Sequence, residues 1–235
     1  MTLLDEVIEA SGGMARWNSL RRFTLQLSLG GTLFSPLCRA DCLKEVVAEG
    51  STGSQSVRFI GFARSTNCAF YQPDSVTIES VEGKTLRTWQ NPLKAFSDRS
   101  TDGRWDELQL VFFCGFSVWN FLTTPFLLAH PDVRVEELPP QREQAQLWRR
   151  LQAVFPPSIT THSSSQMFYF DEQALQRRTD HDLLGVKVAH YSWAHQVFSG
   201  IMVPTLRRSL PLRSDGTVTP GPSLLDVEVF DAWFE

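Results

Sequence analysis

The middle of the chain holds a run of 20 residues without a charge, at positions 110–129 (LVFFCGFSVWNFLTTPFLLA). A helix of this length could span a bilayer. The residues directly flanking the run include Asp106, Glu107, His130 and Asp132, but none of the lysines or arginines that anchor most membrane spans. Polar residues also interrupt the run, and the mean hydropathy of the whole chain is only −0.16. We therefore expect a helix that is buried inside a globular protein rather than a membrane span.

A second pattern, apolar residues at every other position, indicates β-strands. The clearest example is residues 22–29, where Phe23, Leu25, Leu27 and Leu29 alternate with polar or charged residues. Successive side chains of a strand point to opposite faces, so one face of this strand is buried and the other is wet. We expect all four apolar side chains to face the interior.

Further strands are predicted by apolar segments that end at Gly, Pro, Asn or Asp turn signals. They lie at residues 43–48, 57–62, 69–71, 76–82, 86–89, 133–136, 147–155, 167–170, 174–179, 186–198, 201–210 and 224–234. Segment 147–155 also fits a helical pattern, but two prolines follow it and strands surround it, so we expect a strand. The Pro-, Gly- and Ser-rich residues 209–223 predict a long hairpin loop.

These elements predict a mainly β (α+β) protein. About ten to eleven strands joined by hairpins favour one antiparallel sheet that curves into an incomplete β-barrel. The apolar run at 110–129 then becomes a helix that plugs the concave face, and Pro125 should end or kink it. Another helix is expected after Thr2, which can cap it together with Asp5. Residues 1–235 should form a single domain, because no linker is long enough to divide them.

Charge and cysteine content narrow the function classes. The net charge is −4, which gives no electrostatic reason to bind a phosphate backbone, so we expect no nucleic-acid partner. The first residues lack the basic region and apolar run of a secretory signal, so we expect a cytoplasmic protein. Cys38, Cys42, Cys68 and Cys114 are too few for a disulfide scaffold, and their spacing does not match a zinc site. We expect reduced, structural cysteines.

The histidines do not predict a metal or catalytic site. His190 and His195 are an odd number of residues apart on one predicted strand, so they should point to opposite faces. His130, His162 and His181 fall in polar turn or loop contexts. We expect scattered surface or hydrogen-bonded histidines. The chain also lacks the Gly-rich phosphate-binding motifs, so we predict no catalytic residue, metal or cofactor.

Three pairs of adjacent arginines lie on predicted strands, at 149–150, 177–178 and 207–208. Neighbouring residues of a strand point to opposite faces, so the two members of a pair must separate. The simpler expectation is that they form solvated outer faces that shield the sheet. The alternative is that one inward arginine meets a carboxylate or phosphate head group at the mouth of a cavity.

Two segments resemble the C-terminal half of bacterial lipoprotein-carrier proteins of the LolA-like superfamily: residues 165–180 (SQMFYFDEQALQRRTD) and 189–210 (AHYSWAHQVFSGIMVPTLRRSL). In that family a strand with a DE-x-x-L turn precedes paired strands, the second of which begins G-x-x-x-P. The matching residues are Asp171, Glu172, Leu175, Gly200, Ile201 and Pro204. The start of the chain, with Gly12, Gly13 and Trp17 before the first predicted strand, resembles uncharacterised bacterial proteins that form a branch of this superfamily without a signal peptide. The resemblance implies a half-barrel with helices over its mouth and a hydrophobic cavity that shelters acyl chains.

We therefore predict non-enzymatic binding or carriage of a lipophilic small molecule or acyl chain in the half-barrel. The expected ligand-binding residues are Trp89, Phe112, Phe116, Trp119, Phe126, His190 and Tyr191. One alternative is an enzyme that acts on a hydrophobic substrate in the same cavity, with His190 or Tyr191 as acid or base. Another is an interaction domain with a filled core. A cavity on the order of several hundred Å³ would support ligand binding or catalysis, whereas a core without such a cavity would support the interaction domain.

Overall fold

A computed structural model describes residues 1–34, 43–62, 67–97, 105–143 and 145–235. The helices are α1 (Leu3–Ala10), α2 (Met14–Ser19), α3 (Pro92–Ser97), α4 (Glu107–Thr123) and the 3-10 helix η1 (Phe126–Ala129). The strands are β1 (Arg22–Gly30), β2 (Val46–Ser51), β3 (Val57–Ile60), β4 (Asn67–Gln72), β5 (Ser75–Ser80), β6 (Thr85–Gln90), β7 (Arg134–Glu143), β8 (Gln146–Val154), β9 (Ser165–Phe170), β10 (Gln176–Leu183), β11 (Val186–Phe198), β12 (Ile201–Pro211) and β13 (Leu225–Phe234).

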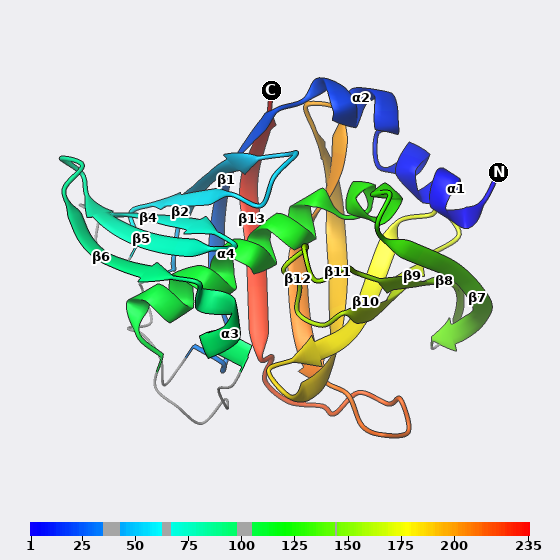
Figure 1. The fold of residues 1–235 in the computed structure, drawn as a ribbon. Helices are drawn as coiled ribbons and strands as arrows, with labels where there is room; N and C mark the ends of the chain where they lie inside the picture. Colours follow the sequence, from blue (N-terminus) through cyan, green and yellow to red (C-terminus); the bar gives the residue numbers. More distant parts are fainter. Residues whose placement is uncertain (35–42, 63–66, 98–104, 144) are drawn as a thin grey trace.

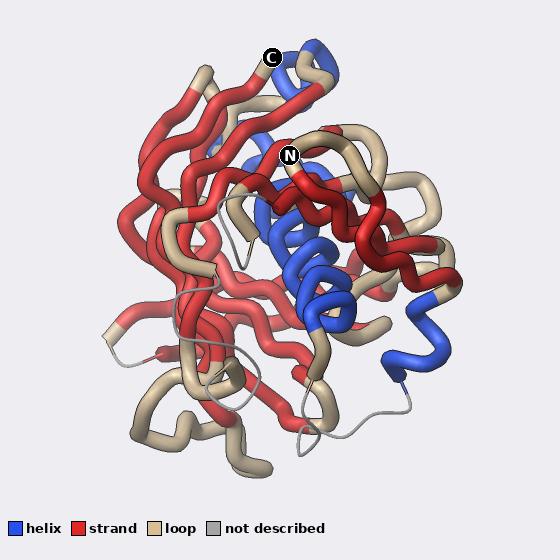
Figure 2. Tube along the Cα trace, turned by 90° about the vertical axis from the view of Figure 1, so that its left-hand side faces the viewer, coloured by secondary structure: helices blue, strands red, loops and turns tan. Residues whose placement is uncertain are grey.

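The described residues form one 13-stranded antiparallel sheet in the order β6-β5-β4-β3-β2-β1-β13-β12-β11-β10-β9-β8-β7. Two meanders, β1–β6 and β7–β13, meet where the first strand pairs with the last (Figure 1). Strands β6 and β7 are the two edges, so the sheet curves without closing (Figure 2). This is the predicted incomplete barrel, with more strands than the ten to eleven expected. Segment 147–155 is a strand, β8, as predicted.

The seam between β1 and β13 confirms the expected orientation of the first strand. Phe23 lies opposite Phe234 and Leu29 lies opposite Val227, with one irregularity after Gln26. The four alternating apolar side chains of β1 are all buried, and the intervening residues are exposed or half-buried. The alternation of apolar and polar residues therefore predicted correctly which side chains of β1 are buried.

Helix α4 connects the two halves of the sheet and lies inside their curve (Figure 2). It begins at a capping box: the Asp106 carboxylate accepts from the Gln109 amide, and the Gln109 side chain accepts from the Asp106 amide. It ends at Thr123, just before Pro125, as predicted. Every residue from Leu108 to Thr123 is buried except the half-buried Phe121, so α4 is the predicted buried plug.

The strands closest to α4 are β3, β4, β5 and β6. Gly115 permits this close packing, because a Cβ at that position would overlap the Tyr71 side chain on β4. Two polar side-chain groups of α4 are hydrogen-bonded to other parts of the chain, whereas Asn120 Oδ1 is buried without a hydrogen-bond partner among the described residues. Trp119 Nε1 donates to the carbonyl oxygen of Ser51 at 2.9 Å, and Asn120 Nδ2 donates to the carbonyl oxygen of Thr160 at 2.9 Å. The partner expected for the buried Asn120 amide is therefore present at Nδ2.

Some local predictions needed adjustment. Helix α1 has the expected capping box of Thr2 and Asp5, but the short helices α2 and α3 were not predicted. Cys68 and Cys114 are buried and unpaired, whereas Cys38 and Cys42 lie outside the described residues. No helix that the described residues form is both long enough and apolar enough to cross a membrane.

Candidate ligand-binding site

A narrow crevice lies between α4 and the central strands of the sheet. Its walls are apolar except for one arginine, and consist of Leu25, Leu27, Val118, Phe121, Leu122, Val203, Pro204, Arg207, Val227 and Val229. These residues come from β1, α4, β12 and β13, whereas α4 packs most closely against β3–β6. The crevice therefore involves a different part of the sheet from the strands that α4 packs against most closely. Its volume of about 20 Å³ admits about one water molecule, so the crevice is far smaller than the cavity, on the order of several hundred Å³, expected for a lipophilic ligand.

Arg207 is the one charged residue in the crevice wall, and it is only 4 % exposed. Its Nη1 donates to Ser192 Oγ at 3.2 Å, and its Nη2 donates to the carbonyl oxygen of Phe121 at 2.9 Å. The guanidinium also lies 5.2 Å from the centre of the Phe121 ring. Among the described residues, Arg207 has no carboxylate partner. Burial lowers its pKa to about 9.

Three histidines form a stacked cluster beside Arg207. Phe121 stacks on His190 at 4.4 Å and on His162 at 5.4 Å, and His162 stacks on His181 at 4.5 Å. His190 Nδ1 lies 2.6 Å from Ser209 Oγ. The prediction of scattered histidines is therefore wrong for these three. The cluster could not be recognised in the sequence, because its three histidines come from a loop and from two different strands.

The histidine cluster is polar but mostly unpartnered. Nε2 of His162 and His190 and both ring nitrogens of His181 are buried without a hydrogen-bond partner among the described residues. Burial lowers the pKa of His181 to about 3. The pKa of His162 lies well below the usual value because of burial and, to a smaller extent, the neighbouring His181. The pKa of His190 is likewise well below the usual value because of burial and, next in size, the charge of Arg207. The part of the chain that the structure describes contains no group of three His, Cys, Asp or Glu residues able to hold a metal.

The predicted ligand-binding residues do not form a single group. Trp89, Phe112 and Phe116 lie together: Phe112 is 6.0 Å from Trp89 and 5.5 Å from Phe116, ring to ring. Phe96 of α3 and Trp105 complete this aromatic cluster by edge contacts. The rings fill the space under β4–β6, away from the crevice.

The other predicted residues occupy separate places. Trp119 is buried and hydrogen-bonded to Ser51, and Phe126 stacks on Trp17 at 4.3 Å. His190 faces α4, but its neighbour Tyr191 is on the opposite, outer face of the sheet. The enzyme hypothesis named either residue as acid or base, and the two candidates lie on opposite faces of the sheet.

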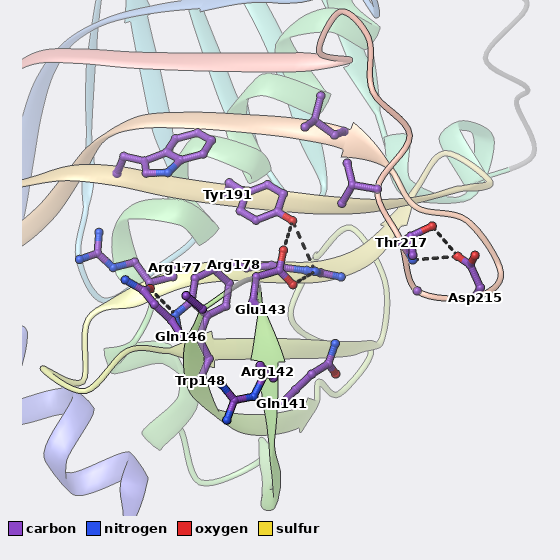
Figure 3. A pocket seen from close by; sticks show the side chains of 15 residues that line it. Gln141, Arg142, Glu143, Gln146, Trp148, Arg177, Arg178, Tyr191, Asp215 and Thr217 are labelled. Carbon is purple, nitrogen blue, oxygen red and sulfur yellow. Dashed lines mark hydrogen bonds and ion pairs between the residues drawn. The ribbon is translucent and has the colours of Figure 1, made fainter.

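Tyr191 belongs to a pocket on the outer face with a volume of about 920 Å³ (Figure 3). Strands β7, β8, β10 and β11 and the loop after β12 line it. Arg178 is at its base, 1 % exposed. It forms two hydrogen bonds to Asp180 and one to Glu143 at 2.9 Å, and Tyr191 donates to Glu143 at 2.7 Å.

Arg207 and Arg208 separate between the two faces, as strand geometry requires, but Arg177 and Arg178 both line the outer pocket, because the pairing of β10 with β9 is irregular between Gln176 and Arg178. Arg149 binds Glu6 and Glu137, Arg177 binds Asp171, and the exposed Arg208 lies 3.5 Å from Asp226. Arg207 points inward instead. Arg207 therefore matches the alternative prediction, in which one arginine of a pair points into the protein. Nothing in the sequence distinguishes it from the other five paired arginines.

No protein-family model matches the chain, and no curated protein is a detectable relative. Solved structures do resemble it. A LolA superfamily protein from Nitrosomonas europaea matches with a TM-score of 0.52 and 9 % identity, over 100 % of this chain and 94 % of that one. A candidate outer membrane lipoprotein-sorting protein domain from Vibrio parahaemolyticus matches with a TM-score of 0.53 and 10 % identity, over 99 % and 92 % of the two chains. A DUF1329 family protein from Desulfovibrio piger matches with a TM-score of 0.51 and 11 % identity, over the same shares. The chain therefore has a LolA-like fold.

Proposed function

We propose that the protein binds a lipophilic ligand, without converting it, between α4 and strands β1, β12 and β13. The observation on which this depends is the apolar crevice, where strands β1, β12 and β13 and one buried helix present apolar side chains to each other. Apolar walls of this kind gain free energy by covering another apolar surface. The ligand class is therefore an acyl chain or a similar lipophilic molecule.

A chain of several carbons needs more room than about 20 Å³, so side chains on the crevice side of α4 move when the ligand enters. The bonding of α4 supports this arrangement. Trp119 and Asn120 tie the helix to the Ser51 and Thr160 carbonyl groups, whereas the contact across the crevice is apolar apart from the bond between Arg207 and Phe121. Apolar contacts have no fixed direction and can re-form around a guest.

The comparisons add support at the level of the fold. One of the similar structures is named for lipoprotein sorting, and lipoproteins carry acyl chains. Because a fold hosts many functions, this similarity only makes the proposal more plausible, and the crevice residues remain its basis.

The test enlarges the crevice and compares it with an equal change elsewhere. Leu27 is fully buried and lines the crevice, whereas the equally buried Leu151 on β8 does not. Each Leu→Ala change should lower the free energy of unfolding by about 2–5 kcal/mol. Only Leu27→Ala should tighten binding of a fluorescent fatty-acid analogue, because it alone adds space there.

Native mass spectrometry of the purified wild type should also reveal a co-purifying lipid. If the wild type and both variants ignore lipophilic probes at micromolar concentration, with unchanged far-UV circular dichroism, the core is filled. The alternative function, an interaction domain, then replaces ligand binding.

A further inference from the structure

We infer that Arg207 receives the anionic group of an amphiphilic ligand, and that this ligand is a single-chain carboxylic acid. The inference rests on the proposed function, because it names the polar end of a ligand whose apolar part lies in the crevice. It depends on the burial of Arg207, its missing counter-charge and its place in the crevice wall.

The first step is the charge of Arg207. A buried guanidinium is unfavourable unless it is paired with an anion. Arg178, which is at least as buried, meets this requirement through Asp180 and Glu143. Arg207 bonds only to a hydroxyl and a carbonyl oxygen among its described contacts, although a guanidinium offers five N–H donors. A ligand carboxylate supplies the missing charge.

The second step is the fixed position of the guanidinium. The Phe121 carbonyl oxygen accepts one N–H bond, and the Phe121 ring lies beside the charge. Both contacts orient the remaining donors before a ligand arrives, which lowers the entropic cost of binding. Leu25, Leu27 and Val229 continue the same crevice as an apolar wall, so the charged and apolar parts of an amphiphile find partners in one place.

The third step is the neighbouring histidine. The ring of His190 stacks on the ring of Phe121, with the ring centres 4.4 Å apart, and Phe121 also contacts Arg207. When Ser209 donates to Nδ1 of His190, the proton of this imidazole is on Nε2, which has no described acceptor. An anion near Arg207 provides such an acceptor. The cluster therefore offers hydrogen-bond capacity as well as charge.

The charge of the site and the shape of its guanidinium favour a carboxylate over a phosphate. One guanidinium balances one negative charge, and its fork matches the two oxygens of a carboxylate. A phosphate monoester brings nearly two charges and three oxygens to the same single arginine.

The test measures displacement of cis-parinaric acid by three ligands with the same chain: dodecanoate, dodecan-1-ol and dodecyl phosphate. We expect the wild type to bind dodecanoate at least about tenfold more tightly than the alcohol, as one charge-assisted bond provides. Arg207→Met should remove this preference and leave the binding of the alcohol unchanged. Arg208→Met is the matched control, because Arg208 is the adjacent residue but is 68 % exposed on the outer face, and it should keep the preference.

The outcomes separate the two proposals. If the wild type binds acid and alcohol equally, the role of Arg207 is wrong while lipophilic binding stands. If no ligand displaces the probe or the probe itself does not bind, the proposed function fails. Tighter binding of dodecyl phosphate than of dodecanoate overturns the assignment of a carboxylate. The acid-to-alcohol ratio of the wild type needs no variant, so it decides the question even if Arg207→Met does not fold.

Discussion

Two buried arginines, Arg178 on the outer face of the sheet and Arg207 on the inner face, have opposite surroundings. Arg178 is 1 % exposed and Arg207 is 4 % exposed. For Arg178, burial acts to lower the pKa, but the hydrogen bonds and charge of Asp180 outweigh it and the pKa is raised. For Arg207, burial acts alone and lowers the pKa to about 9. The first arginine is part of a completed ion cluster, whereas the second has a charge that the described residues leave unbalanced.

The comparison teaches that pairing, rather than burial, distinguishes a structural charge from a candidate binding charge. Arg178 finds its partner two positions away on its own strand, at Asp180, and therefore on its own face. The equivalent neighbour of Arg207 is Ser209, which has no charge and is engaged with His190. Among the described residues, Arg207 on the inner face has no carboxylate partner, which is the difference on which the proposed role of Arg207 depends.

The largest effect should come from breaking the outer cluster. Arg178→Met leaves Asp180 and Glu143 without their shared cation, and removal of one partner from a buried ion cluster costs about 3–5 kcal/mol. Urea denaturation at pH 7 should show this loss in the free energy of unfolding. Arg177→Met, which removes a more exposed arginine from one ion pair, is the control and should cost less. A loss below about 1 kcal/mol for Arg178→Met would mean that water already compensates the cluster.

The next largest effect is a pH dependence of the unfolding free energy, caused by the buried His181 on the inner face. The pKa of His181 is about 3 in the folded protein because of burial, against about 6.5 in an unfolded chain. The unfolded chain therefore binds more protons between these values, so the stabilisation present above pH 6.5 is lost as the pH falls toward 3. Between pH 6.5 and 5 the loss for this one histidine is about 2 kcal/mol.

His181→Phe isolates that contribution. Phenylalanine keeps an aromatic ring in the stack with His162 but cannot take up a proton. The difference between the unfolding free energies of wild type and variant should change by about 2 kcal/mol over this pH range. Parallel pH curves for the two proteins would contradict the buried, neutral state of His181.

The smallest expected effect on stability tests the contrast between Arg178 and Arg207 at Arg207 itself. Arg207→Met removes an unbalanced buried charge and keeps an apolar side chain of similar length, so the unfolding free energy should rise, by about 1 kcal/mol. Arg208→Met should change it by less than about 0.5 kcal/mol, because that residue is exposed. A loss of more than about 2 kcal/mol in Arg207→Met would show that Arg207 stabilises the fold as Arg178 does.

Much of the fold was predictable because its strongest signals are local. The alternation in β1, the uncharged run of α4 and the stop at Pro125 all depend on residues close in the chain. The pairing of β1 with β13 was not predictable from these signals, because it joins opposite ends of the chain. The short helix α3 was missed because Pro92 was interpreted only as the end of a strand.

The candidate site was predictable only in kind. The crevice is not lined by the aromatic residues that the sequence named on the central helix, Phe112, Phe116 and Trp119. The sequence offered an inward arginine only as the alternative to solvated pairs, and it could not rank those pairs. That ranking depends on whether a carboxylate from another strand reaches the guanidinium, as Glu143 reaches Arg178. The histidine stack likewise depends on the position of the loop that holds His162, which no periodic pattern describes.

The seam between β1 and β13 has a consequence for how the chain folds as it is synthesised. Strand β1 precedes the other strands in the chain, yet its partner on one side, β13, is synthesised only after all the strands from β2 to β12. Until then β1 presents an unpaired edge, and the crevice side of α4 lacks its wall from β13. Closing contacts between the most distant parts of a sequence is slow. The nascent protein therefore exposes the crevice residues of β1 until β13 is made, and we expect this edge to be a place where aggregation or chaperone contact occurs.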